Sequence, residues 1–88
     1  MVQINSSSHF IRAFKKLPRQ IQDDFEEKIS LFIKNPRHPQ LRTHPLKGKF
    51  RECLAFQLED GYRVLFEFSN PNTVNLLDVG PHNIYRKR

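Results

Sequence analysis

Two alternating apolar patterns flank the segment Glu59-Asp60-Gly61, and together they leave few folds open to the chain. Neighbouring residues of a strand point to opposite faces, so each pattern predicts a strand with one apolar face. A three-residue loop with Gly61 in the left-handed conformation would pair Leu58 with Tyr62 and keep the apolar sets on one face, whereas a two-residue loop would mix the faces. The apolar sets are Leu54, Phe56 and Leu58, then Tyr62, Val64, Phe66 and Phe68.

The three-residue loop places Arg63 opposite Gln57, on the sheet face that points away from the apolar side. This arginine, in the middle of a strand on that face, is the single residue of the chain that is most informative about function. A third strand follows after a short turn. Apolar residues stand at both odd and even positions in it, so the sequence does not decide which of its side chains point to the apolar face. The three strands of this antiparallel meander are predicted at Arg51–Leu58, Tyr62–Phe68 and Thr73–Val79.

The N-terminal half predicts a short strand and two helices. Met1 to Asn5 forms the strand, added to an edge of the sheet, and the serines at positions 6–8 offer N-cap hydroxyls for a first helix of about ten residues. Pro18 ends that helix and begins a second, which stops at Asn35-Pro36 and leads into an irregular linker through Thr43. The helical stripes are Phe10, Ile11, Phe14 and Leu17, then Ile21, Phe25, Ile29, Phe32 and Ile33.

These elements predict an α+β fold in a single domain, residues 1–88. A two-helix hairpin packs on one face of the sheet, and the other face is open to solvent and ligand. The single cysteine excludes an internal disulfide, which fits a reducing compartment, and no secretory or membrane-spanning segment is apparent. We therefore expect a cytoplasmic protein without membrane contact.

The formal net charge is +6, which favours a polyanion or an acidic protein as partner. The two signs are separated, because four carboxylates gather at positions 23–27 whereas all charges from Arg37 to Arg51 are basic. The alternative interpretation of the net charge is that scattered cations merely keep a small protein soluble. The separation indicates a dedicated anion-binding side.

If the open face binds RNA, its residues suit cleavage without a metal. Such a reaction needs a base, an acid and cations at the phosphate. His82 and His44 are candidates for proton transfer, Arg63 for holding the phosphate, and Tyr85 for stacking or proton donation. The alternatives are a surface or loop role for the histidines, and for Arg63 a cross-strand contact with Glu67 or Gln57. The candidate RNA-binding residues are Lys47, Lys49, Arg51, Gln57 and Arg86.

Other chemistries find less support in the sequence. The histidines and the cysteine show none of the usual zinc spacings, and there is no phosphate-binding glycine loop, so we expect neither metal nor cofactor. Carboxylates near the candidate site are few, which disfavours a two-carboxylate hydrolase. We assign His9 and His38 to ordinary surface positions.

The pattern THPLKGKFRECLAFQLEDGYRVLFEF followed by VNLLDVGPHNIYRKR resembles the RelE/ParE superfamily of bacterial toxins from toxin–antitoxin pairs, and the RelE and YafQ branches most. The likeness runs over nearly the whole chain, and the part from His44 onward is specific. It implies the same fold and a metal-independent endoribonuclease that cleaves messenger RNA, often on the ribosome. It also implies a cognate antitoxin, whose complex with the toxin often binds operator DNA.

Residue by residue, the YafQ-like branch implies histidines at His44 and His82, and the RelE-like branch an arginine at Arg63. The chain departs from the YafQ-like pattern at Gln57 and Gly61, where relatives often carry histidine and aspartate, and it lacks an extra C-terminal helix. Two other functions stay open at this point. One is the ParE-like mode, non-enzymatic inhibition of DNA gyrase, and the other is a basic nucleic-acid-binding module without catalysis.

Overall fold

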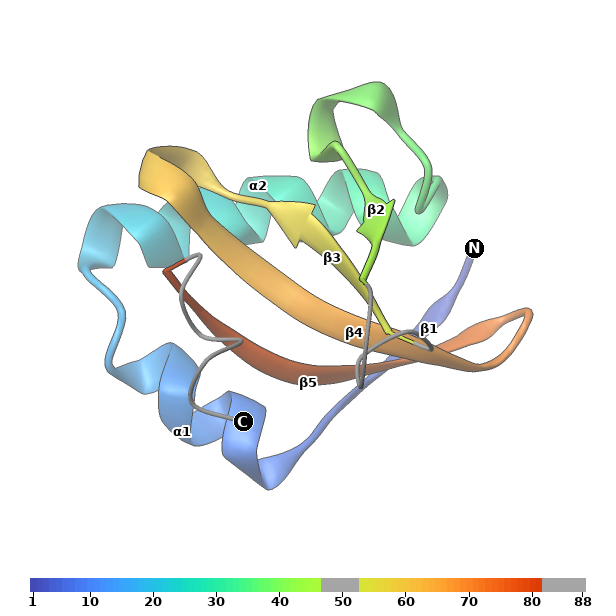
Figure 1. The fold of residues 1–88 in the computed structure, drawn as a ribbon, viewed down its shortest axis with the longest axis horizontal. Helices are drawn as coiled ribbons and strands as arrows, with labels where there is room; N and C mark the ends of the chain where they lie inside the picture. Colours follow the sequence, from blue (N-terminus) through green and yellow to red (C-terminus); the bar gives the residue numbers. More distant parts are fainter. Residues whose placement is uncertain (47–52, 82–88) are drawn as a thin grey trace.

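A mixed sheet forms the centre of the computed structural model, which describes residues 1–46 and 53–81. Its strands are β1 (Gln3–Ser6), β2 (His44–Pro45), β3 (Leu54–Gln57), β4 (Tyr62–Asn70) and β5 (Thr73–Pro81). The strand order is β1-β5-β4-β3-β2, in which β1 runs parallel to β5 and the other neighbours are antiparallel (Figure 1). The expected C-terminal meander and the N-terminal strand at an edge of the sheet are both confirmed.

The turn between β3 and β4 has the register expected from the apolar alternation. A short 3-10 turn, η3 (Glu59–Gly61), joins the strands, the backbone N–H of Leu58 donates to the carbonyl of Tyr62 at 2.7 Å, and Gln57 lies opposite Arg63. Gly61 has a φ of +77°, and Asp60 also has a positive φ of 56°. The loop therefore keeps both apolar sets on one face, which leaves Arg63 on the other.

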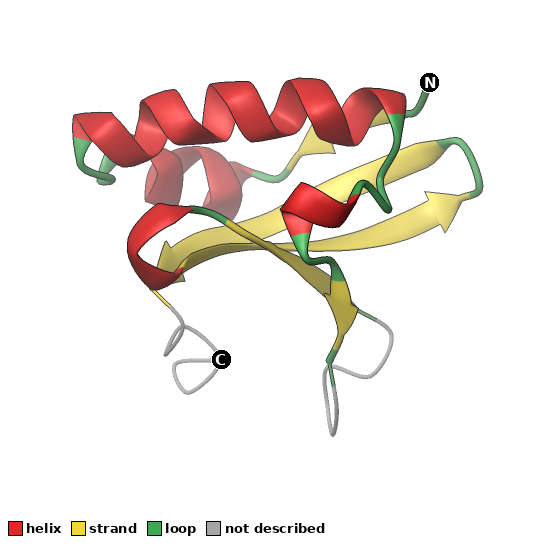
Figure 2. Ribbon diagram, turned by 90° about the horizontal axis from the view of Figure 1, so that it is seen from above, coloured by secondary structure: helices red, strands yellow, loops and turns green. Residues whose placement is uncertain are grey.

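Two helices cover the apolar face of the sheet. Helix α1 (Ser8–Lys15) begins at Ser7, whose hydroxyl accepts from the N–H of Phe10 at 3.0 Å, and α2 (Arg19–Lys34) follows Pro18. Figure 2 shows α2 lying across one face of the twisted sheet, with no described helix against the opposite face. Figure 1 shows α1 alongside β5. The expected helical hairpin on one side is thus present.

The core is rich in phenylalanine and joins α2 to the sheet. The ring of Phe32, from α2, lies 5.0 Å from that of Phe56 and 4.9 Å from that of Phe66, measured between centroids. Phe25 makes a similar contact with Phe14 of α1, at 5.1 Å. Burial of such rings is the main term that stabilises a domain of this size, because each removes a large apolar area from water.

The linker before β3 contains more structure than we expected from its prolines. A 3-10 turn, η1 (Pro39–Leu41), is followed by β2, which pairs with β3. Pro45 has no N–H to donate, and it is tolerated because β2 lies at the edge of the sheet. His44, the first residue after the predicted linker, therefore lies on a short strand that we did not predict. The first residues of the predicted strand Arg51–Leu58 fall outside the described ranges.

The structure also decides the facing of β5. Val74, Leu76 and Val79 are all buried in the core, although 76 and 79 have opposite parity. The register shifts between them, since Phe66 pairs with Leu76 and Leu65 with Asp78. The extra residue is accommodated as a bulge, which returns the following residues of β5 to the core face.

The face away from the helices is less open than we expected. Ala55 and Leu65 are fully buried, although neither belongs to the core cluster between sheet and helices. They lie opposite each other at the centre of this face. The expected open face is therefore not exposed at Ala55 and Leu65, which form a buried apolar pair on it.

Candidate functional site

The candidate site begins with two neighbouring rows of residues on the sheet face away from the helices. One row runs from Gln57 on β3 to Arg63 on β4 and Gly80 on β5. The next row contains His44 on β2, followed by Ala55, Leu65 and Asp78 on the other strands. Paired residues of adjacent strands share a face, so His44, Gln57 and Arg63 lie on the same side of the sheet.

Arg63 carries a buried donor that has no partner among the described residues. Its Nε is shielded from solvent, and within those ranges nothing accepts a hydrogen bond from it. The alternative of a contact with Glu67 is not observed: Glu67 lies on the same strand as Arg63, and its carboxylate accepts from the side chain of Asn75 at 3.3 Å. A buried donor left unpaired costs free energy, and an anion that enters as the covering groups move aside would recover this cost by accepting a hydrogen bond from it.

His44 is held by the backbone just before its strand. Its Nδ1 lies 3.0 Å from the carbonyl oxygen of Arg42, a residue in the left-handed conformation with φ of 51°. A carbonyl oxygen can only accept, so Nδ1 carries the proton and the lone pair of the neutral ring is on Nε2. This tautomer leaves Nε2 as the atom that can take a proton from a ligand.

The turn that precedes Arg63 is anchored to α2 by a buried carboxylate. Asp24 is 5% exposed, and its Oδ2 accepts from the N–H of Glu59 at 2.9 Å while its Oδ1 lies 2.7 Å from Nζ of Lys28. Gln20 adds a contact, donating from Nε2 to Asp60 at 3.2 Å. The start of β4, and with it Arg63, is therefore positioned by the second helix as well as by the sheet.

The remaining candidates lie outside the described ranges, so their positions relative to Arg63 stay predictions. They comprise two of the residues considered for proton transfer and all of the basic residues considered for RNA binding. These residues are Lys47, Lys49, Arg51, His82, Tyr85 and Arg86.

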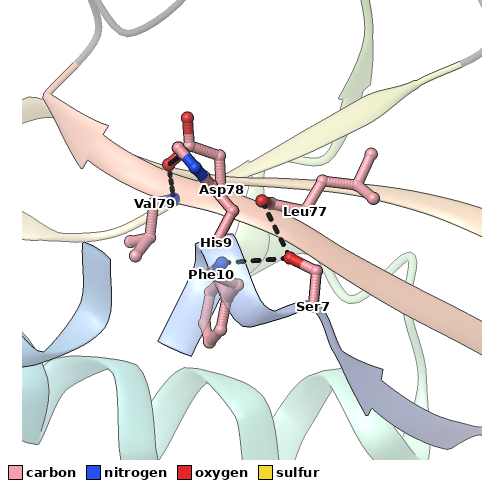
Figure 3. A network of polar contacts seen from close by, with 6 residues as sticks. All are labelled: Ser7, His9, Phe10, Leu77, Asp78 and Val79. Atoms are coloured by element: carbon pink, nitrogen blue, oxygen red, sulfur yellow. Dashed lines mark hydrogen bonds and ion pairs between the residues drawn. The ribbon is translucent and has the colours of Figure 1, made fainter. Parts of the chain in front are cut away.

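The structure adds a pair that the sequence did not indicate, His9 with Asp78. Nε2 of His9 lies 3.1 Å from Oδ1 of Asp78, which also accepts from the N–H of Val79 at 2.8 Å (Figure 3). Asp78 is 6% exposed, whereas the imidazole remains 55% exposed. The pair is far apart in sequence and forms because Ser7 bonds to β5: its N–H donates to Leu76 and its hydroxyl to the carbonyl of Leu77.

The ordinary assignment of His9 was therefore incomplete, whereas that of His38 agrees with the structure. The Nδ1 of His38 accepts from the N–H of Gln40 at 3.2 Å and so caps η1. No local motif could have exposed the His9 contact, because it depends on where α1 meets β5.

Metal-ligating and membrane-spanning features are both absent from the part of the chain that the structure describes. Within residues 1–46 and 53–81, no three side chains of the histidine, cysteine, aspartate and glutamate types come together as a metal-ligand group. In those ranges no helix combines the length and the apolar character needed to cross a bilayer.

Comparison with known proteins identifies the fold. No protein-family model matches the sequence, and no curated protein matches it significantly. Among solved structures, YafQ of E. coli superposes with a TM-score of 0.79 at 15% identity, covering 97% of this chain and 98% of that one. The YoeB/ParE toxin of Agrobacterium tumefaciens superposes with a TM-score of 0.77 at 10% identity, covering 92% and 99%.

A third match comes from the intact E. coli RelBE toxin–antitoxin complex. It has a TM-score of 0.72 at 18% identity and covers 92% of this chain and 96% of that one. The matches span nearly the full length of each chain, so the likeness includes the helices as well as the sheet. The protein therefore has the fold of the RelE/ParE toxins.

Proposed function

We propose that this protein is the toxin of a toxin–antitoxin pair and an endoribonuclease that cleaves messenger RNA without a metal. The observation that carries the proposal is the buried Nε of Arg63, on the sheet face away from the helices, which has no partner among the described residues. In a protein with this fold, such a donor is suited to a phosphodiester, which a guanidinium binds through two parallel hydrogen bonds.

The sheet geometry supports a shared ligand between Arg63 and His44. Two inter-strand spacings and an offset of two residues put their Cα atoms about 12 Å apart. Both side chains lie on the same face, and the arginine is long, so a phosphodiester placed between them could contact both. Gln57, which lies between the two in the sheet, can donate a further hydrogen bond to it.

The reaction assigned to these groups is a transesterification. The 2′-hydroxyl attacks the adjacent phosphorus, Nε2 of His44 takes its proton, and the bond from phosphorus to the 5′-oxygen breaks. Arg63 stabilises the charge that develops on the phosphate oxygens. His82 returns a proton to the 5′-oxygen, leaving a 2′,3′-cyclic phosphate and a 5′-hydroxyl. Tyr85, Lys47, Lys49, Arg51 and Arg86 are assigned to holding the RNA, and translating ribosomes are its proposed site.

The antitoxin is proposed to dock in the groove between the two helices and β1. An apolar groove of about 280 Å³ lies between α1, α2 and β1 and includes Phe10, Phe14 and Ile29. Ile11 borders it and is 45% exposed. The match to a chain from a toxin–antitoxin complex supports an amphipathic antitoxin segment as the occupant. Operator DNA would then be bound only through that complex.

The nuclease proposal is tested by primer extension on a messenger RNA in a translating extract. The full-length protein is expected to create new RNA ends, and Arg63→Met is expected to remove them. Arg19→Met serves as the control, because Arg19 is 85% exposed and pairs with Asp23 on α2, away from the site. If the wild-type protein creates no new ends, the proposal is wrong.

The match to a protein described as a YoeB/ParE toxin favours one second candidate, inhibition of DNA gyrase without catalysis. A supercoiling assay with purified gyrase separates the two functions. Loss of supercoiling in the presence of the protein, together with unchanged messenger RNA, would select the second.

A further inference from the structure

A cleft of about 410 Å³ lies between α1 and the end of β5, beside the row that contains Arg63. Its volume falls within the range of about 300–1,000 Å³ typical of small-molecule sites. The described residues that line the cleft are of two kinds. Helix α1 contributes charged and imidazole groups, whereas the sheet and the junction between the helices contribute apolar groups. The lining includes His9, Arg12, Lys16, Leu17, Tyr62 and Pro81.

Two cations give this cleft its charge. Arg12 and Lys16 are four residues apart, on α1 and at its C-terminal cap, and therefore lie on the same side of the helix. Both are exposed, and within the described ranges neither takes part in an ion pair. Asp78 is the carboxylate in the described lining, and it already accepts from His9 and from the N–H of Val79. The described lining of the cleft therefore carries a net positive charge.

The sheet side of the cleft can accept a base. Tyr62 is half-buried and lines the cleft together with Pro81, its partner across the β4–β5 pair. A tyrosine ring offers a face on which any base can stack. Cations on one side and an aromatic ring on the other match the two ends of a nucleotide.

The cleft also continues from the proposed cleavage site. Gly80 lines it and lies directly opposite Arg63 on the neighbouring strand, so β5 places no side chain at that position. Tyr62 belongs to the helix side of the sheet and Arg63 to the opposite face, but β1 pairs with β5 only as far as Leu76. A strand of RNA whose phosphate sits at Arg63 can therefore pass over Gly80 and around this edge of β5 towards α1 and Tyr62. Such a path needs cations at its far end, and Arg12 and Lys16 are there.

We infer that this cleft is a nucleotide subsite for the RNA strand next to the scissile phosphate. Arg12 and Lys16 hold a neighbouring phosphate, and Tyr62 with Pro81 contacts the base. The inference rests on the proposed function in taking RNA as the ligand, and it adds a binding element on the first helix. The pair with Asp78 holds His9 at the rim of the same cleft.

The test measures binding without cleavage. The probe is a short, labelled oligonucleotide of 2′-O-methyl RNA, which has no free 2′-hydroxyl to attack, and the readout is fluorescence anisotropy with the full-length protein. The double variant Arg12→Ala/Lys16→Ala is expected to bind about tenfold more weakly, equivalent to ~1.4 kcal/mol. The slope of log K against log salt should become shallower by about 0.7 for each phosphate that the variant no longer neutralises.

Lys15→Ala is the matched control. Lys15 lies in the last turn of the same helix and carries the same charge, but it lines the apolar groove on the other side of α1. Thermal unfolding of all variants checks that they remain folded. Lys15→Ala removes one charge and the double variant removes two, so a general charge effect would make the control lose about half as much binding free energy as the double variant. A loss of that size or larger in Lys15→Ala would overturn the subsite, as would unchanged binding in the double variant.

Two further arms separate the possible ligands. Adenosine monophosphate should bind more tightly than ribose 5-phosphate if the base is contacted, and equal affinities would overturn that part of the inference. A polyglutamate peptide is used as a competitor for the labelled oligonucleotide. If the peptide displaces the oligonucleotide through Arg12 and Lys16 at a lower concentration than unlabelled RNA does, the cleft is assigned to an acidic protein segment. Cleavage is measured separately, so a wild type that binds but does not cleave would contradict the nuclease proposal and leave the subsite intact.

Discussion

Replacing Arg63 by methionine should abolish RNA cleavage without destabilising the protein. Most substitutions in a half-buried position destabilise, but here the wild-type side chain carries a buried Nε without a partner among the described residues. An unsatisfied buried donor costs about 1–3 kcal/mol, and methionine removes it while keeping an unbranched apolar stem of similar length. We therefore expect the free energy of unfolding to stay equal or to rise.

The size of the effect follows from that penalty. A gain of about 1 kcal/mol would raise the melting temperature by about 4–8 °C in a domain of this length. Methionine cannot hold a phosphate, so the new RNA ends seen with the wild type should be absent in primer extension. The expected result is thus a variant that is as stable as the wild type, or more so, and is inactive.

Lys28→Met is the matched comparison for stability. Lys28 is a cation on α2 that does have a partner, since its Nζ lies 2.7 Å from Oδ1 of Asp24, a side chain that is 4% exposed. Its loss leaves that carboxylate short of a partner. Because the Lys28 side chain is itself 20% exposed, we expect a loss of roughly 2 kcal/mol, or about 8–16 °C.

Calorimetry and circular dichroism on the three purified proteins measure these changes. A fall in the melting temperature of Arg63→Met comparable to that of Lys28→Met would show that the guanidinium is satisfied in the folded protein. The physical basis for an anion site at Arg63 would then be refuted. Retained cleavage by Arg63→Met would refute its role at the phosphate independently of stability.

Three further substitutions test the fold and the proposed surfaces. Phe56→Ala removes a fully buried ring packed on Phe32 and should lower the free energy of unfolding by about 3–5 kcal/mol. The variant should be largely unfolded at urea concentrations at which the wild type stays folded. Gly61→Ala meets no steric contact but must adopt a φ of +77°, so a loss of about 1 kcal/mol is expected, and an unchanged melting temperature would contradict this interpretation of the turn. Ile11→Asp should weaken antitoxin binding at least tenfold in calorimetric titration while cleavage continues, and unaltered antitoxin affinity would exclude the groove as its docking site.

Several features of the fold could be predicted from the sequence because they depend on local rules. The alternation on either side of Glu59-Asp60-Gly61 allowed a single loop length that kept the apolar residues together, and that loop put Arg63 opposite Gln57. The helices follow from their apolar stripes and from the serine cap before α1. Neighbouring residues alone determine such features, so no knowledge of distant contacts was needed.

Other features depend on segments that are distant in sequence, and only the tertiary structure could decide them. His44 lies on a strand because β3 offers it an edge to pair with, and the bulge in β5 reconciles Leu76 and Val79 with one core. The contact of His9 with Asp78 arises where the start of α1 is bonded to β5, and the burial of the Arg63 Nε without a described acceptor depends on how its neighbours pack. Local sequence determined where the strands turn and which way their side chains point, whereas long-range packing determined which polar groups meet and which remain available to a ligand.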